Sequence, residues 1–374
     1  MSNFVTAFKK GKEGLNFGLS TGLPTLDLAM NKIQKGTSYG VAAAPKCGKT
    51  TFVDFSFIIS PYLEAEALGT LDNLEFIYWS FEIDRINKEF KFAAFFMAHD
   101  FQQYNYTYDG VLYPMDQDYL QGKKLHKNSQ GRLVIIPISE EHEEMLKVIY
   151  EKRIVPLFGR WSEGGKLIEK GKILFIEERD NPTGMWKLLL HHAKQNGEFI
   201  TEEFHTLDEK NNRVKRTRII GYKAKNPNMN TICITDHVRK LRRERGFSMK
   251  DNIDKWLEYS TEIRNLCAYI FVHIVHSNRN LANVDRLKFA GEFIFPTGDD
   301  TKDSGNIAEE CTIFMTLFNP NDEKYNLKKH FDVELANYPN YRSIHITESR
   351  YTECPVHIQT NMYGGINTFE PLNR

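Results

Sequence analysis

The segment Gly40-Val-Ala-Ala-Ala-Pro-Lys-Cys-Gly-Lys-Thr-Thr51 constrains the fold of this 374-residue chain more than any other feature. An apolar run ends here in a short loop, and Gly48-Lys49-Thr50 then opens a segment with a helical pattern. In a strand, loop and helix of this kind, backbone N–H groups and the helix N-terminus converge on one small volume and favour a polyphosphate. The segment therefore predicts a P-loop, although Ala43 stands where the usual pattern has its first glycine.

The P-loop predicts ATP and Mg²⁺ as cofactors. Lys49 would reach the β- and γ-phosphates, and the hydroxyl of Thr50 would bind Mg²⁺. We expect Lys49 to face solvent while the loop holds no nucleotide. The residues assigned to nucleotide binding are consecutive: Ala44, Pro45, Lys46, Cys47, Gly48, Lys49, Thr50 and Thr51.

Composition and charge limit the partners and the compartment. Lys plus Arg equals Asp plus Glu at 49 each, so net charge does not indicate a nucleic acid, and any basic surface must be local. The five cysteines are widely spaced without a C-x-x-C pair, which argues against a zinc site or disulfides and fits a reducing compartment. We find no signal peptide and no stretch of about 18 apolar residues, so we expect a cytoplasmic protein without membrane contact.

Apolar strands alternate with helical segments, which predicts an α/β fold with a mostly parallel sheet covered on both faces. The expected strands are Ser38–Ala43, Leu74–Trp79, Lys172–Glu177, Thr231–Asp236, Tyr269–Val275, Ala308–Leu317 and Ser343–Thr347, with Pro355–Thr360 in a closing antiparallel hairpin. The expected helices are 49–63, 83–98, 140–151, 184–195 and 252–267.

The same pattern suggests a domain organisation. Residues 1–35 are expected to be a lead-in and linker, and residues 36–374 a single domain with insertions at about 100–135 and 201–228. Asn211-Asn212 lies between two alternating segments, so the second insertion is expected to be a hairpin.

Polar side chains stand at the ends of three predicted strands. Glu82, Asp236 and His276 would meet at the carboxyl edge of a parallel sheet, where such folds bind ligands. Asp236 would bind the Mg²⁺ shell, Glu82 would act as general base or orient water, and His276 would sense the γ-phosphate. Simpler interpretations stay open: a carboxylate capping a strand, an acid favoured by a helix dipole, and a structural histidine.

Together these segments resemble the RecA-like ATPase domain of DnaB-type (superfamily four) hexameric replicative helicases. Thr21-Gly-Leu-Pro-Thr-Leu-Asp27 is similar to that family's Thr-Gly-x-x-x-Leu-Asp. Ala43-Ala-Pro-Lys-Cys-Gly-Lys-Thr50 is similar to its Ala-x-Pro-x-x-Gly-Lys-Thr, which also has Ala in place of the first Gly. Ser80-Phe-Glu-Ile83 is similar to its Ser-Leu-Glu-Met, whose Glu is the catalytic base.

Later segments extend the resemblance. Ile173-Leu-Phe-Ile-Glu-Glu-Arg-Asp-Asn-Pro-Thr-Gly184 is similar to the strand and helix before the family's Walker B strand, and Asp303-Ser-Gly-Asn-Ile307 to Glu-Ser-Gly-Ser-Ile. Val275-His-Ser-Asn-Arg279 resembles Ser-Gln-x-Asn-Arg, with His276 at the Gln sensor. Thr347-Glu-Ser-Arg350 falls at the family's Lys-x-Arg, whose Arg is an arginine finger donated to a neighbouring subunit. Glu348 replaces the Lys, which puts half of that pair in doubt.

The resemblance implies a homo-oligomeric, hexameric ring with single-stranded DNA and other replication proteins as partners. The DNA contacts would lie in the loops after the Walker B and sensor strands, and a solvated charged face is the alternative for each of them. Arg286 and Lys288 in the second loop, and the cations of the 201–228 hairpin, are weaker candidates. The residues assigned to nucleic acid are Arg239, Lys240, Arg242, Arg243, Arg245 and Arg279.

Three functions remain open from the sequence. The first is an ATP-driven helicase or translocase on single-stranded DNA, with Glu82, Lys49, His276 and Arg350 as catalytic residues and Thr50 and Asp236 as metal ligands. The second is a RecA-fold ATPase that uses ATP as an assembly switch, as in a recombinase filament or a loader, without unwinding. The third is a structural protein that kept the fold and lost catalysis.

Overall fold

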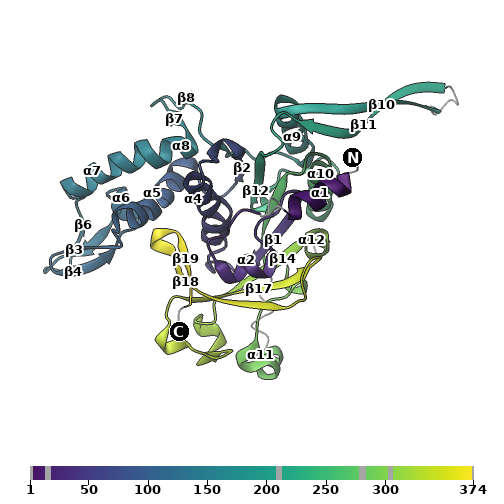
Figure 1. Ribbon diagram of the computed structural model, residues 1–374. Coiled ribbons are helices and arrows are strands. Elements are labelled where there is room, and N and C mark those ends of the chain that lie inside the picture. The colour runs from purple at the N-terminus through teal and green to yellow at the C-terminus, as the bar shows by residue number, and fades with distance from the viewer. Residues whose placement is uncertain (1–2, 13–17, 208–212, 278–283, 302–305, 373–374) are drawn as a thin grey trace.

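The computed structural model describes residues 3–12, 18–207, 213–277, 284–301 and 306–372. A nine-stranded sheet in the order β19-β18-β17-β14-β1-β13-β12-β2-β9 lies at its centre (Figure 1). Its parallel strands are β1 (Ser38–Ala43), β2 (Leu74–Ser80), β9 (Ile173–Ile176), β12 (Asn230–Asp236), β13 (Ile270–His276) and β14 (Ile313–Phe318). The antiparallel strands β17 (Tyr341–Ser349), β18 (Val356–Tyr363) and β19 (Thr368–Pro371) extend one edge. The mostly parallel sheet with an antiparallel C-terminal hairpin is confirmed.

Helices cover both faces of the sheet, because its strands are apolar on both sides. Phe52, Phe57 and Phe92 pack with Tyr39 and Val41 on one face, and Trp256 packs with Trp79 on the other. The first face is covered by α3 (Lys49–Asp54), a π-helical turn (Phe55–Ile59), α4 (Ser60–Ala67) and α5 (Arg85–Phe101). The second is covered by α9 (Pro182–Asn196), α10 (Met249–Cys267) and α12 (Asn306–Glu310).

The register of the parallel strands brings their carboxyl ends together. Ala43 of β1 is level with His276 of β13, and Asp236 of β12 is level with Ser80 of β2. The chain segments that follow these residues therefore meet at one edge of the sheet, as expected for a ligand site in a parallel α/β fold.

One strand begins later in the structure than the sequence predicted. Residues 308–312 were expected to start a strand, but Asn306–Glu310 is the helix α12 and β14 begins at Ile313. Ile307, Ala308 and Cys311 are buried while Glu309 and Glu310 are exposed. This spacing is helical rather than alternating, and it places the apolar residues against α10.

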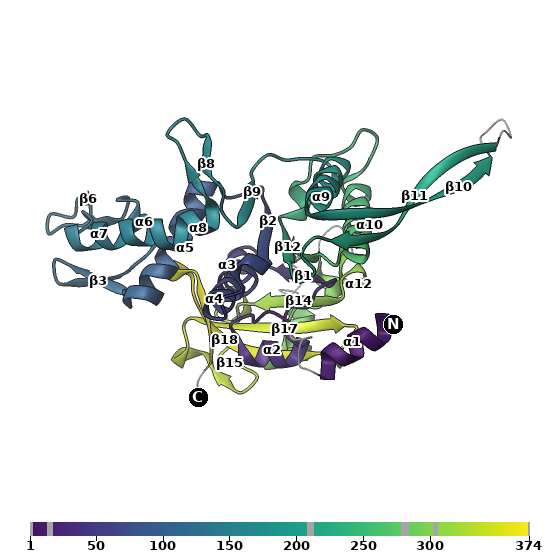
Figure 2. The same cartoon turned by 45° about the horizontal axis from the view of Figure 1, so that its top comes forward.

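Both predicted insertions have regular structure. The first contains β3 (Asn105–Tyr108), β4 (Val111–Pro114), α6 (Gln117–Leu120), β5 (Leu125–Lys127) and β6 (Leu133–Ile135), and is followed by α7 (Glu140–Ile149), a π-helical turn (Tyr150–Ile154) and α8 (Val155–Phe158). The second is a long hairpin of β10 (Gly197–Leu207) and β11 (Arg213–Ala224), which projects from the domain in both views (Figure 2). The turn expected at Asn211-Asn212 lies outside the described residues.

The remaining elements are short. They are α1 (Asn3–Lys12), α2 (Pro24–Met30), β7 (Arg160–Trp161), β8 (Leu167–Glu169), α11 (Val284–Ala290), β15 (Lys329–His330) and β16 (Val333–Glu334), together with short 3₁₀ turns. Leu26 and Met30 of α2 are buried in the same core as α3. Among the described residues, no helix is both long enough and apolar enough to span a membrane.

Candidate active site at the carboxyl edge of the sheet

The loop between β1 and α3 contains the residues that the sequence assigns to phosphate binding. Gly48 has a φ of 98° and is the N-cap of α3, which starts at Lys49. A Cβ at Gly48 would lie 2.1 Å from the sulfur of the flexible Met362 side chain on β18, which would have to move, and the positive φ is what favours glycine here. The side chains of Cys47 and Thr51 are buried, and burial raises the pKa of the Cys47 thiol to about 11. The backbone N–H of Cys47 donates to the carbonyl of Ala44 over 3.3 Å.

Lys49 does not face solvent, contrary to the sequence-based expectation. Its side chain is 8% exposed. Its Nζ donates to the carbonyl oxygens of Ala43 (3.1 Å) and Ala44 (3.2 Å) and lies 3.0 Å from Nδ1 of His276. Burial lowers the pKa of the Lys49 ammonium. The end of β1 thus provides acceptors that hold the lysine inward when no phosphate competes for it.

Thr50 and Asp236 form a pair of oxygen ligands beside the loop. The Thr50 hydroxyl donates to Oδ2 of Asp236 over 3.3 Å, and the backbone N–H of Phe81 donates to the carbonyl oxygen of Asp236 over 2.8 Å. Asp236 is 1% exposed, and burial together with the nearby acids Asp54 and Glu82 raises its pKa. A hydroxyl and a carboxylate are hard oxygen donors, which suit Mg²⁺, and a cation here would offset the cost of burying the carboxylate.

A buried polar network supports Asp236 from behind. The Tyr78 hydroxyl lies 3.2 Å from Oδ2 of Asp236 and 3.3 Å from Oδ1 of Asp54. Lys88 of α5 donates to both carboxylate oxygens of Asp54 over 2.7 Å, and both side chains are fully buried. Sequence reasoning missed this network. Asp54 within the apolar run from Phe52 to Phe57 was the available signal, because a charge inside an apolar helix needs a partner.

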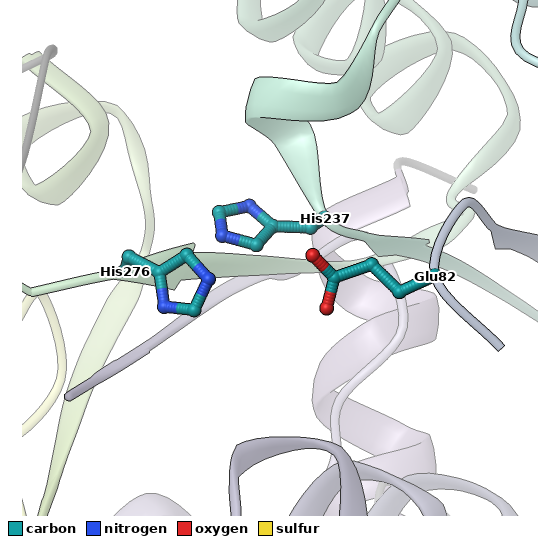
Figure 3. Close-up of side chains that lie close together, drawn as sticks. All are labelled: Glu82, His237 and His276. Carbon is teal, nitrogen blue, oxygen red and sulfur yellow. The ribbon is translucent and has the colours of Figure 1, made fainter. Parts of the chain in front are cut away.

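Glu82 and His276 do meet at this edge, and His237 joins them (Figure 3). One ligand atom from each of the three side chains lies within 4.8 Å of the others. Glu82 is 37% exposed, and its carboxylate lies 3.8 Å from Nζ of Lys240. Burial lowers the pKa of His276 to about 4 and that of His237 to about 2, so both imidazoles are neutral near pH 7. His237 was not assigned to this site from the sequence.

Arg350 lies at the opposite edge of the sheet. Its backbone N–H donates to the carbonyl of Thr312, whose own N–H donates to the carbonyl of Ser38 at the start of β1. The length of β1, roughly 17 Å at about 3.3 Å per residue, separates this level from the P-loop. The side chain is exposed, and its Nη2 donates to the Glu309 carbonyl over 3.3 Å. Arg350 is therefore not brought to the P-loop of its own chain.

The predicted basic loop begins directly at the site. Arg239 and Lys240 follow His237 and are half-buried, and the exposed cations are Arg242, Arg243 and Arg245. The loop is fixed by Glu244, whose carboxylate accepts from Thr183 (2.6 Å) and Lys255 (2.6 Å).

Other basic candidates have partners or lie outside the described residues. Arg286 of α11 is bound to Asp300, with Nη2 2.9 Å from Oδ2. On the hairpin, Arg218 pairs with Glu202 and Lys215 pairs with Glu203. Asn278, Arg279 and the segment 303–305 lie outside the described residues.

The glycine-containing loop after β1 lies at the carboxyl edge of a mostly parallel sheet, and Asp236 ends β12, which is separated from β1 by β13. The structure is similar to the ATPase domain of G40P, with a TM-score of 0.63 and 11% identity over 99% of this chain and 97% of that one. It is also similar to a DnaB-like replicative helicase, with a TM-score of 0.61 and 12% identity over 99% of this chain and 66% of that one. No protein-family model and no curated protein sequence matches the chain. The comparisons confirm the RecA-like ATPase fold that the resemblance implied.

Proposed function

We propose that this protein is an Mg²⁺-dependent ATP hydrolase. The observation that carries the proposal is the meeting of Lys49, the Thr50–Asp236 pair and Glu82 at one edge of the sheet. Lys49 would leave the carbonyls of Ala43 and Ala44 for the β- and γ-phosphates. Thr50 and Asp236 would hold Mg²⁺, which neutralises charge on the phosphates when bound.

Glu82 is the group placed to act on the attacking water. Glu82 is more exposed than Asp236, and it lies beside the neutral imidazoles of His237 and His276. It would orient a water molecule and accept its proton as the oxygen attacks. His276, released by Lys49 when that side chain moves to the phosphates, would donate to the γ-phosphate.

The first test compares Lys49→Ala and Glu82→Gln with Lys147→Ala, an exposed lysine of α7 paired with Glu143 and Glu144. We expect both site variants to lose steady-state hydrolysis by at least about 100-fold and the control to keep it. Lys49→Ala removes one donor each from the carbonyls of Ala43 and Ala44, which keep the backbone N–H groups of Ser277 and Cys47 as partners. Folding of the variant is checked by circular dichroism. Full turnover by either folded site variant would refute the assignment.

We further propose that hydrolysis drives movement on single-stranded DNA in a homo-oligomeric ring. Support comes from the basic loop, which starts at the residue after Asp236, and from Arg350, which is exposed and lies away from the P-loop of its own chain. The assembly switch is the second candidate. Glu348 favours it, because an acid stands where a trans-acting lysine would be needed.

The DNA contact is tested by replacing Arg242, Arg243 and Arg245 together with Ala. Binding of a fluorescent oligonucleotide should weaken, and the slope of log affinity against log salt should fall by about 2, at about 0.7 per phosphate contact on a single strand. The matched control replaces Arg213, Arg216 and Arg218 of the hairpin. An unchanged slope in the loop variant would exclude this loop as the DNA contact.

A forked duplex separates the two candidate functions. A motor should displace one strand with ATP and fail with a non-hydrolysable analogue, whereas a switch should bind the single strand and hydrolyse ATP without displacing anything.

A further inference from the structure

His237 presents a buried hydrogen-bond donor that the proposed roles do not use. Its side chain is 1% exposed. Its Nδ1 accepts from the backbone N–H of Arg239 over 3.4 Å. Its Nε2 is buried and has no hydrogen-bond partner within the part of the chain that the structure describes. Buried polar atoms are nearly always paired, so this one calls for an explanation.

The hydrogen bond at Nδ1 determines which nitrogen carries the proton. A neutral imidazole has one N–H, and a nitrogen that accepts from a backbone N–H cannot also carry it. The proton of His237 is therefore on Nε2. In Figure 3 the ring nitrogen of His237 farther from its backbone lies on the side toward His276.

His276 is oriented in the same way. Its Nδ1 lies 3.0 Å from the Lys49 ammonium, which can only donate, so the proton of His276 is also on Nε2. The ring centroids of the two histidines are 4.0 Å apart. Both rings therefore carry an Nε2–H donor and lie in one cluster with Glu82, beside Lys49. Neutral N–H donors next to an ammonium are suited to an oxyanion.

A transition metal would not fit this hydrogen-bonding pattern. The cluster of Glu82, His237 and His276 has ligand types that bind Zn²⁺, but a metal requires unprotonated nitrogens. Both Nε2 atoms carry protons, and the ammonium of Lys49 next to His276 would repel a dication.

We propose that His237 donates its Nε2–H to the γ-phosphate of the bound nucleoside triphosphate, and that it thereby reports the γ-phosphate to the basic loop. The inference rests on the proposed function, because Lys49 must hold the phosphates for the γ-phosphate to lie here. A diphosphate leaves the Nε2–H of His237 without an acceptor.

The ring of His237 is tied to the loop that follows it. Its Nδ1 accepts from the backbone N–H of Arg239, and Nζ of Lys240 lies 3.8 Å from the Glu82 carboxylate, so both residues after Val238 contact side chains of the cluster. Binding or loss of a γ-phosphate would change the position of the ring and, through these two contacts, that of the loop. The exposed arginines at 242, 243 and 245 would respond to the state of the nucleotide.

The test compares His237→Phe, which keeps a ring and removes the donor, with His237→Gln, which keeps an N–H donor. Affinities of fluorescent ATPγS and ADP analogues with Mg²⁺ are measured for each. We expect His237→Phe to lose about tenfold in ATPγS affinity, or about 1.4 kcal/mol, with ADP affinity unchanged. His237→Gln should recover part of the loss. His237→Met provides a second donor-free variant should the Phe variant fail to fold.

Hydrogen exchange of residues 238–246 tests the link to the loop. In the wild type, exchange should differ between ATPγS and ADP, and in the donor-free variant the ATPγS pattern should match that of ADP. A donor-free variant that keeps the wild-type ratio of the two affinities would overturn the inference. Tight Zn²⁺ binding to the nucleotide-free protein, lost on substitution of His237, would also overturn it.

The same binding measurements distinguish a failure of the proposed ATPase function from a failure of the proposed role of His237. If wild-type protein binds neither analogue, the proposed function is wrong. If wild-type protein distinguishes the analogues and the donor-free variant does so equally well, only the role of His237 is wrong.

Discussion

The Lys88→Met substitution should destabilise the fold far more than the loss of a surface charge. Lys88 and Asp54 are fully buried, and Nζ donates to both carboxylate oxygens over 2.7 Å. Removing the lysine leaves the Asp54 carboxylate buried, with the Tyr78 hydroxyl at 3.3 Å as a weaker hydrogen-bond partner. An uncompensated buried charge costs about 3–5 kcal/mol, a large part of the roughly 5–15 kcal/mol that stabilises a typical domain.

The measurement is urea unfolding followed by circular dichroism, with two controls. Lys147→Met removes an exposed lysine that pairs with Glu143 and Glu144, and should leave the free energy of unfolding nearly unchanged because solvent screens such pairs. The double substitution Asp54→Asn with Lys88→Met removes both charges, so it should be clearly more stable than Lys88→Met alone. The reasoning fails if Lys88→Met costs as little as the surface control, or if the two single losses simply add in the double variant.

Three further results are expected. Glu82→Gln should reduce hydrolysis by at least about 100-fold while ATPγS affinity stays near the wild-type value, and a proportional loss of affinity would contradict its role as base. Arg350→Ala should be inactive alone and regain activity when mixed with Lys49→Ala, since each variant supplies what the other lacks; mixtures that stay inactive would argue against trans action. Burial lowers the pKa of His273 to about 3, against about 6.5 in the unfolded chain. The unfolded chain therefore binds more protons between these values, so the free energy of unfolding should fall as pH drops from 6.5 to 3, and His273→Phe should flatten that dependence.

The sequence was most informative where apolar runs end in polar residues. The predicted strand Ser38–Ala43 matches β1. Glu82 and His276 lie together at one edge of the sheet, beside His237, the residue after Asp236. Parallel strands place their carboxyl ends on the same side, so these positions followed from strand assignment alone.

Side-chain partners across the core could not be predicted in this way. Lys88 lies in an amphipathic helix and resembles a surface lysine until α5 is packed against α3, where it meets Asp54. Lys49 was expected to face solvent while the loop holds no nucleotide, and the carbonyls that bind it belong to Ala43, the last residue of β1, and to Ala44 after it. His237 resembled the first residue of a basic loop, and only the tertiary structure places its ring against His276.

The positions of the P-loop and Arg350 at opposite edges of one sheet have a consequence for symmetry. Were Arg350 to complete a neighbour's site, the contact would join two different surfaces, and a two-fold dimer could not satisfy both of them. Head-to-tail contacts of this kind close into a ring when the rotation per subunit divides a full turn, and otherwise continue as a helical filament. The ring motor and the filament-forming switch would then use the same interface. They would differ only in the rotation that this interface produces between adjacent subunits.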